Sequence, residues 1–274
     1  MEHGKHTIII HDMIVRSTTA ELPSKSLAYT LLAMTRIAIM SDPHSNLEAL
    51  TQVIHDIDAQ SVDETICLGD AIGYGPQPQE CCDLLREKKV ILIQGNHEQG
   101  LINIHLSSGF NQPARDALRK TREMITEETY QWLISHPKSL VAHGCRFVHG
   151  APPDSVNEYI WKYEKSMSEI FSRFTEDICF VGHTHDLMRF TYDGEASKKL
   201  PLPEGDTILE PNMRHLVNVG AVGQPRDGNN NAKYALFDTD TRTVTVRFIP
   251  YDIQKTADLI RAKGFSRAYA DRLF

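Results

Sequence analysis

The stretch RIAIMSDPHSNLEAL, residues 36–50, decides the fold. Its first five residues are mostly apolar, which is typical of a buried strand. Beyond it, apolar side chains recur three and four residues apart, which predicts an amphipathic helix with Leu47, Leu50, Val53, Ile54 and Ile57 on one face. Asp42 and His44 lie between the two patterns, where the strand ends. The sequence therefore places a carboxylate and an imidazole at a strand tip.

The same order of strand, polar tip and helix recurs further along the chain. ETICLGD (64–70) is followed by a Gly/Pro-rich loop, and Pro78 suits the first turn of the next helix. VILIQGNHE (90–98) is a second apolar run with a polar end. Residues 99–138 read as helices, with Thr126 as an N-cap, and form either a lid or a packing layer.

After residue 138 the chain consists mainly of strands. SLVAHGCRFVHGAP (139–152) reads as a hairpin, DICFVGHTH (177–185) as a strand with a polar tip, and a helix closes the chain. We therefore predict an α/β fold with two mixed β-sheets packed face to face and flanking helices, a four-layer α/β/β/α sandwich. Residues 34–274 form its single domain. Residues 1–33 are a weakly structured extension or follow from a misassigned start codon.

Composition excludes several classes of protein. The chain has 274 residues, 41% of them apolar, and a net charge of −7 with a pI of about 6.0. This charge argues against a stable nucleic-acid partner or an anionic membrane surface. No apolar run approaches the ~18–20 residues of a membrane span. The five cysteines are odd in number and lack C-x-x-C spacing, which indicates a reducing cytoplasm.

Five strand ends carry polar side chains of one chemical kind. They are Asp42-x-His44, Gly69-Asp70, Gly95-Asn96-His97-Glu98, His149-Gly150 and Gly182-His183-x-His185. Ligands of open α/β sheets bind at the carboxyl ends of strands, so we expect these tips to converge. Carboxylate, imidazole and carboxamide donors without thiolates suit one or two divalent first-row metals. Each motif alone is weak evidence for a metal site. The prediction depends on the occurrence of all five motifs, each directly after a strand.

Asp70 is the predicted bridge between two metal ions. It lies between the two ligand groups in chain order and follows a glycine that allows close backbone approach. Two divalent ions bring a charge of +4 and the carboxylates of Asp42 and Asp70 bring −2. The remaining local charge of +2 would attract a phosphate. His143 and His149 both precede glycine, at opposite ends of one strand. Only one of the two can face the metal site. We predict that it is His149, because this residue ends its strand as the residues of the other tips do.

From about Arg36 to the C-terminus, the ordered motifs D-x-H, GD, GNHE, HG and GHTH resemble the calcineurin-like metallophosphoesterase superfamily. HSNLEAL, GDAIGYGPQPQEC, FVHGAP and NVGAVGQPRDG further resemble its small prokaryotic branch of phosphodiesterases and diadenosine-tetraphosphatase-like proteins. The resemblance implies a first metal held by Asp42, His44 and His185, a second held by Asn96, His149 and His183, and Asp70 between them. It implies that a metal-bound hydroxide attacks the phosphorus in line.

The resemblance gives His97 a catalytic role above the scissile phosphate, with Glu98 as the partner that orients it. Arg226 and Gln224 in VGQPRDG, and Tyr74 in GYGP, are candidate substrate contacts. An exposed turn explains the first two equally well, and Tyr74 either stacks on a base or simply covers the helix below it. Pro43 biases Asp42 towards an extended backbone. Ser45 is strained if its position requires a positive φ.

The predicted function is a metal-dependent phosphoric ester hydrolase that acts on a phosphodiester, phosphomonoester or nucleoside-polyphosphate bond. Mn is the first choice of metal, with Fe, Zn, Ni or Co as alternatives. The predicted partner is a small phosphorylated substrate, and the sequence leaves open whether the chain forms a homo-oligomer. A non-catalytic metal-binding scaffold of the same fold would have lost ligands or His97, and these are intact. A DNA-repair nuclease would need a basic groove. A protein phosphatase stays open.

Overall fold

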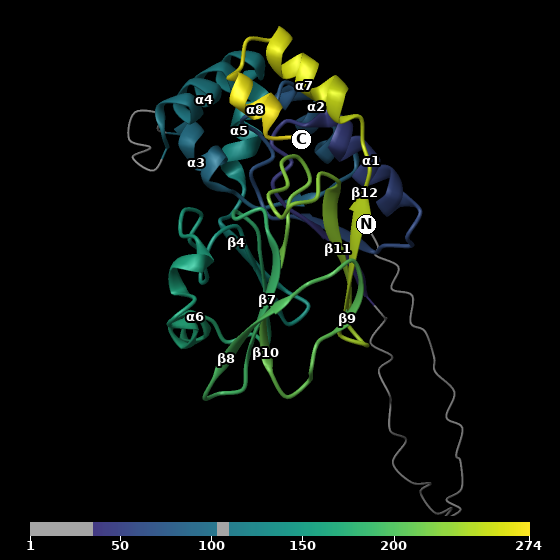
Figure 1. The fold of residues 1–274 in the computed structure, drawn as a ribbon, viewed down its shortest axis with the longest axis vertical. Coiled ribbons are helices and arrows are strands. Elements are labelled where there is room, and N and C mark those ends of the chain that lie inside the picture. Colours follow the sequence, from purple (N-terminus) through teal and green to yellow (C-terminus); the bar gives the residue numbers. More distant parts are fainter. Residues whose placement is uncertain (1–34, 103–109) are drawn as a thin grey trace, which may run out of the picture. The chain divides into compact units, whose positions relative to one another are not determined.

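The computed structural model describes residues 35–102 and 110–274, which belong to one compact unit, and the predicted extension 1–33 lies outside the described residues (Figure 1). One mixed six-stranded sheet has the order β3 (Ile91–Leu92), β2 (Glu64–Cys67), β1 (Arg36–Met40), β11 (Ala232–Asp238), β12 (Thr243–Ile249), β9 (Gly205–Ile208). Strands β1, β2 and β3 are parallel, and β11 pairs antiparallel with β1.

The second mixed sheet also has six strands. Its order is β4 (Ser139–Ala142), β5 (Cys145–Val148), β6 (Ile178–Val181), β10 (Arg214–Val219), β7 (Leu187–Tyr192), β8 (Ser197–Pro201). Strand β6 is parallel to both of its neighbours, β5 and β10, and the other pairs are antiparallel. Parallel strands direct their carboxyl ends to the same edge of a sheet, and these strands carry the predicted tips.

Alternation of side chains along β1 explains why the sheets stack. Ile37 and Ile39 face the second sheet and pack in a buried cluster with residues such as Phe180 and Phe237. Ala38 and Met40 face the opposite way and pack beneath helices. A strand that is apolar on both faces must be covered on both, so the second sheet covers one face and helices the other.

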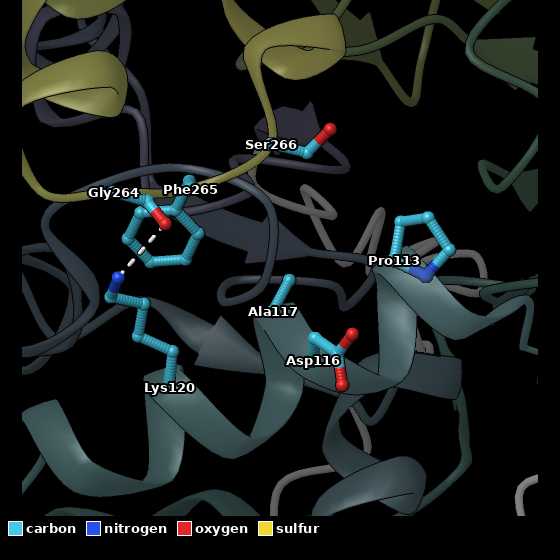
Figure 2. A pocket seen from close by; sticks show the side chains of 7 residues that line it. All are labelled: Pro113, Asp116, Ala117, Lys120, Gly264, Phe265 and Ser266. Carbon is cyan, nitrogen blue, oxygen red and sulfur yellow. Dashed lines mark hydrogen bonds between the residues drawn. The ribbon is translucent and has the colours of Figure 1, made fainter.

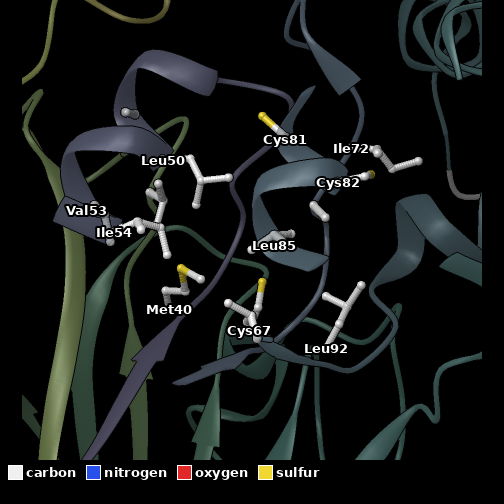
Figure 3. Close-up of a cluster of buried hydrophobic side chains, with 14 of the residues drawn as sticks. Met40, Leu50, Val53, Ile54, Cys67, Ile72, Cys81, Cys82, Leu85 and Leu92 are labelled. Carbon is white, nitrogen blue, oxygen red and sulfur yellow. The ribbon is translucent and has the colours of Figure 1, made fainter. Parts of the chain in front are cut away.

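Helices cover the outer face of each sheet. Helices α1 (Leu47–Asp58) and α2 (Pro78–Glu87) pack on the first sheet around a cluster that includes Met40, Leu50 and three cysteines (Figure 3). The 3₁₀ helix η1 (Ile160–Tyr163) and α6 (Met167–Ser172) cover the second sheet. This arrangement confirms the predicted α/β/β/α sandwich. Pro78 opens α2 as the sequence predicts.

Three helices form the segment predicted over residues 99–138. They are α3 (Asn96–Ile102), α4 (Gln112–Met124) and α5 (Glu127–Ser135). Thr126 caps α5 as predicted, because its side chain accepts a hydrogen bond from the backbone N–H of Thr129 at 3.1 Å. Leu118 and Leu133 are fully buried in the cluster beneath α1 and α2. The described part of this segment therefore forms a packing layer.

The C-terminal helices α7 (Ile253–Ala262) and α8 (Arg267–Asp271) pack against α4. Their shared apolar cluster includes Ala117, Ile260, Phe265 and Tyr269. No helix within residues 35–102 and 110–274 has the length and apolar character that crossing a membrane requires.

Candidate metal centre

The predicted strand tips meet at one edge of the sandwich. The backbone N–H of Asp42 donates to Gly69 O at 3.1 Å, and that of His44 donates to Asp70 O at 2.9 Å. In the second sheet, the backbone N–H of Gly182 donates to His149 O at 2.9 Å. The backbone N–H of His183 donates across the sheets to Asp42 Oδ2 at 3.0 Å. These hydrogen bonds fix the tips relative to one another.

Asp42, His44 and His185 form one buried group with metal-ligand spacing. Asp42 Oδ1 lies 3.5 Å from His44 Nε2 and 3.1 Å from His185 Nε2. The two Nε2 atoms are 3.2 Å apart. The structure thus brings together three side chains that are up to 143 positions apart in the chain.

Asp70, His149 and His183 form a second buried group. His149 Nε2 lies 3.3 Å from Asp70 Oδ2 and 3.1 Å from both His183 Nδ1 and Asn96 Oδ1. Asp70 Oδ2 also lies 3.7 Å from His44 Nε2, which belongs to the first group. Asp70 is therefore the carboxylate between the two groups, and all seven predicted metal ligands lie in one place.

Hydrogen bonds to backbone carbonyls orient three of the imidazoles. The Nδ1–H groups of His44, His149 and His185 donate to Ile72 O, Leu68 O and Gln224 O at 3.1, 2.9 and 2.6 Å. A carbonyl oxygen only accepts, so in the neutral ring the proton is on Nδ1 and the Nε2 lone pair points into the centre. Two such lone pairs, from His44 and His185, face each other 3.2 Å apart, an arrangement that a cation between them would stabilise.

An unpartnered polar atom points to the same cation. Within the described residues, Asp42 Oδ1 is buried without a hydrogen-bond partner and lies beside the Nε2 atoms of His44 and His185. Buried polar atoms normally have partners, because leaving one unpaired costs about 1–3 kcal/mol. The donor set of carboxylates, imidazoles and one carboxamide fits divalent first-row metals. The residues present therefore fit the predicted metal ions.

The charges of the groups also favour a cation. Burial raises the pKa values of Asp42 and Asp70, but the nearby imidazoles outweigh burial and hold both below the usual range. Burial lowers the pKa values of His183 to about 3 and His185 to about 4. For His149, burial is outweighed by Asp70 and Asp42, which raise its pKa to about 9. The carboxylates of Asp42 and Asp70 therefore favour a cation at the centre.

The ligand-bearing tips are strained. Asp42, His44 and Asp70 have φ values of 55°, 46° and 53°, in the left-handed region. The prediction that Pro43 keeps Asp42 extended is wrong, because the cross-strand hydrogen bonds of the tip override the local preference. Ser45 has a φ of 55°, so its position does require the left-handed conformation.

His97 is fully buried at the side of the centre. Its Nε2 lies 3.9 Å from Asp70 Oδ2, and its ring packs edge-to-face against His44, Tyr74 and Phe110. Burial lowers the pKa of this imidazole to about 3. A Cβ atom on Gly73 would lie 2.0 Å from His97 Nδ1, so glycine at this position makes room for the ring.

Glu98 does not reach His97 in the structure. Its Oε2 instead accepts hydrogen bonds from the backbone N–H groups of Asp70 and Gly95, each at 2.8 Å. Burial raises the pKa of this carboxyl to about 7. The structure therefore corrects the expectation that Glu98 orients His97, and shows that Glu98 ties two strand tips together.

The candidate substrate contacts lie around the centre at different depths. Tyr74 packs against the rings of His44 and His97, with centroids 4.6 and 4.5 Å away. Gln224 is buried next to His185, and the exposed Arg226 donates to Gln224 Oε1 at 2.9 Å.

His143 lies in the β4–β5 hairpin, where its Nε2 is 2.9 Å from Glu64 Oε2, so it is not part of either metal-ligand group. Two aromatic residues beside the centre were not predicted. Tyr159 stacks on His183 at 3.9 Å between centroids, and Phe110 packs against His97. Both lie outside the tip motifs, and nothing in the local sequence distinguishes them.

The sequence model of the calcineurin-like phosphoesterase superfamily domain matches residues 35–242, so the chain belongs to this family. It is accordingly a metal-dependent phosphoric ester hydrolase by class. An uncharacterized protein of Methanocaldococcus jannaschii is 34% identical over 244 residues, which cover 87% of this chain and 97% of that protein.

Solved structures agree on the fold. A metallophosphoesterase from Sphaerobacter thermophilus is 35% identical, with a TM-score of 0.75 over 87% of this chain and 98% of that one. A hypothetical protein from Pyrococcus horikoshii is 19% identical, with a TM-score of 0.68 over 88% and 98% of the two chains, and is similar in fold. A structure named as a candidate diadenosine tetraphosphatase is 14% identical, with a TM-score of 0.52 over 80% and 96% of the chains.

Proposed function

We propose that this protein is a dinuclear-metal-dependent phosphoesterase that hydrolyses a phosphodiester, phosphomonoester or nucleoside-polyphosphate bond. The position of Asp70 carries the proposal. Its Oδ2 lies 3.7 Å from an imidazole of one ligand group and 3.3 Å from an imidazole of the other. A carboxylate in this place can serve two cations at once, which a single-metal site does not need.

The two groups divide the ligands between two ions. Asp42, His44 and His185 would hold one ion, Asn96, His149 and His183 the other, and Asp70 both. Mn is the first choice, with Fe, Zn, Ni or Co as alternatives. When bound, such a pair of ions lowers the pKa of water and stabilises negative charge on a phosphate.

The residues around the ions bind and orient the substrate. His97 would donate a ring N–H to a phosphate oxygen or to the leaving oxygen, and the packing of Tyr74 and Phe110 fixes its ring. Glu98 would act as a positioning residue, because it holds the tip of Asp70 against the tip of Gly95. Arg226 would bind phosphate oxygens with Gln224 beside it.

The test is hydrolysis by chelator-stripped protein to which Mn²⁺, Ni²⁺, Zn²⁺ or Mg²⁺ is returned. Bis-p-nitrophenyl phosphate and p-nitrophenyl phosphate distinguish diesterase from monoesterase activity. We expect turnover only with metal and a loss of about 10²–10⁴-fold in His97→Ala, the range for a general acid or base. His143→Ala is the matched control, because His143 lies in a hairpin outside both ligand groups, and it should keep full activity.

The outcomes separate the alternatives. Turnover without metal, or equal activity of His97→Ala and His143→Ala, would contradict the proposed mechanism. Two bound ions per chain without turnover of either ester would favour the non-catalytic scaffold. Dephosphorylation of phosphopeptides with neither small ester turned over would favour a protein phosphatase.

We also infer a cytoplasmic location and a small phosphorylated substrate as the partner. All five cysteines are free and buried, as suits a reducing compartment.

A further inference from the structure

Two arginines from distant parts of the chain converge on one buried glutamine. Gln224 Oε1 accepts a hydrogen bond from Arg226 Nη2 at 2.9 Å and lies 3.4 Å from Arg272 Nη1. Both guanidinium groups line one open pocket with Pro225, Gly228 and Asn230. The Gln224 side chain is only 2% exposed, so the point on which the arginines converge is fixed.

These two guanidinium groups form no ion pair among residues 35–102 and 110–274, although the Asp186 carboxyl interacts electrostatically with Arg226. No carboxylate oxygen there lies within 4.0 Å of either group. The acids next to them in sequence are engaged elsewhere, since Asp227 pairs with Lys233 at 2.8 Å and Asp271 with Arg261 at 3.1 Å. Two like charges that share one neutral acceptor repel each other, and an anion between them would relieve the repulsion.

Packing holds Arg272 in this place. It directly follows α8, whose Tyr269 packs on Tyr74 with centroids 4.7 Å apart, and Leu273 is buried. The side chain of Asn230 donates to Phe274 O at 2.8 Å.

The start of α8 is anchored at α4. Figure 2 shows the hydrogen bond from Lys120 Nζ to Gly264 O, 3.0 Å long, with Phe265 beside the lysine. Lys120 Nζ also lies 5.0 Å from the centroid of the Phe265 ring. The helix that precedes Arg272 is therefore fixed at both ends.

The pocket adjoins the candidate metal centre. The backbone N–H of Arg226 donates to His185 O at 3.2 Å, and Gln224 O accepts the Nδ1–H of His185 at 2.6 Å. The segment that carries Gln224 and Arg226 is thus the segment that orients the imidazole of His185. An anion at the arginines would lie next to a phosphate at the metal ions.

We propose that Arg226 and Arg272 form a subsite for a second phosphoryl group, adjacent to the one that is hydrolysed. The inference rests on the proposed phosphoesterase function and narrows its substrate to phosphoanhydrides such as nucleoside polyphosphates. Guanidinium groups are suited to this role because they bind phosphate oxygens in a bidentate manner.

In the reaction, the oxygen of water bonds to the phosphorus at the centre, and the P–O bond to the bridging oxygen breaks. The electron pair of that bond leaves with the second phosphate, which the arginines hold. The two hydrogens of the water are distributed between the phosphate products or released to solvent. No other co-reactant is needed.

The test measures binding by calorimetry, so that it does not depend on turnover. Methylene-bridged ADP, which has two phosphoryl groups and resists hydrolysis, is compared with AMP on the Mn²⁺-loaded protein. We expect the wild type to bind the ADP analogue at least tenfold more tightly than AMP. In Arg272→Gln and Arg226→Gln that preference should fall about tenfold or more, as for loss of a charged hydrogen bond.

Arg267→Gln is the matched control. Arg267 lies on α8, which directly precedes Arg272, and its side chain is 83% exposed. Its Nε lies 3.7 Å from Asp271 Oδ2, and Arg267 does not line the pocket. It should keep the wild-type preference and activity.

Equal affinity of the wild type for the two nucleotides, or an unchanged preference in both pocket variants, overturns the subsite. Failure to hydrolyse bis-p-nitrophenyl phosphate, p-nitrophenyl phosphate or ADP with any metal, alongside an intact preference, would instead overturn the proposed catalytic function.

Discussion

The strand tips at the candidate metal centre and the apolar layer between the two sheets are built in opposite ways. Seven of the eleven non-glycine residues with positive φ in the described part of the chain lie at the tips or in the loops that follow them, namely Asp42, His44, Ser45, Asp70, Tyr74, His183 and His185. The layer between the sheets consists of regular strands with fully buried Ile37, Phe147 and Phe180. The layer provides stability, and it offsets the strain and the unpaired polar atoms that the tips hold in place.

The largest predicted effect comes from a substitution that disrupts the apolar layer and leaves the tips unchanged. Phe237 is 2% exposed, and its ring centroid lies 5.2 Å from that of Phe180. It pairs with Ile37, at the end of β1 that is remote from Asp42. Phe237→Ala should lower the free energy of unfolding by about 3–5 kcal/mol, through lost burial and a cavity. Urea denaturation measures this loss. Activity per folded molecule should not change.

Ile208→Ala is the control for Phe237→Ala, because Ile208 is 68% exposed and its truncation should shift stability by about 0.5 kcal/mol or less. A loss of activity in Phe237→Ala under conditions where the protein is fully folded would show that the layer and the tips are not separable.

The second prediction concerns a substitution that disturbs the candidate metal centre and leaves the apolar layer unchanged. In Gly73→Ala the added Cβ would lie 2.0 Å from His97 Nδ1, so the imidazole must move. We expect kcat/KM to fall about 100-fold, equivalent to about 2.7 kcal/mol, with metal content unchanged. Steady-state kinetics and metal analysis measure the two quantities.

Gly194→Ala is matched to Gly73→Ala in backbone strain. Gly194 has a φ of 102° against 92° for Gly73, but no heavy atom would lie within 4 Å of its added Cβ. This variant should lose stability and keep its kcat/KM. Similar kinetics of the two variants would show that the position of His97 is not what Gly73 protects.

The smallest predicted effect concerns an ion pair between α1 and β12, Asp56 with Arg247. Asp56 accepts from Arg247 Nε at 2.5 Å and from Tyr234 Oη at 2.6 Å. Burial raises the pKa of Asp56, but Arg247 and Tyr234 outweigh burial, so the folded-state pKa is lowered. Asp56→Asn should lose about 0.5–1 kcal/mol at pH 7, since solvent screens this partly exposed pair.

The sign of the pH dependence follows from the lowered pKa. The stabilisation is complete above the pKa of the unfolded state, about 3.9, and is lost as the pH falls through the folded-state value. Melting curves of wild type and Asp56→Asn should differ at pH 7 and converge below about pH 4. A difference that stays constant with pH would assign the effect to packing instead of charge.

The layers and the positions of the strand tips could be predicted from the sequence, because the strands are apolar runs that end in polar residues. Each tip follows a run of apolar residues, so the ends of β1, β2 and β6 could be located without a structure. The conformation of Asp42 was mispredicted, because the preference that Pro43 imposes is local while the hydrogen bonds from Gly69 and His183 come from other strands.

The role of Glu98 was mispredicted for a related reason. Neighbours in a helix point about 100° apart, so adjacency to His97 in sequence does not bring the two side chains together. Arg272 and Tyr159 were not predicted at all. Both residues are far from the tip motifs in sequence. They reach the centre because α8 packs on Tyr74 and Tyr159 packs on His183, and residue spacing in the sequence does not reveal such tertiary contacts.

Three buried cysteines, Cys67 on β2 and Cys81 and Cys82 on α2, can report how often the helical layer opens. Burial raises the pKa values of Cys67, Cys81 and Cys82, so the reactive thiolate is scarce in the folded protein at neutral pH. An alkylating reagent reaches these thiols only when the helical layer separates from the sheet. The rate of their modification therefore reports how often that layer opens, without any probe being attached.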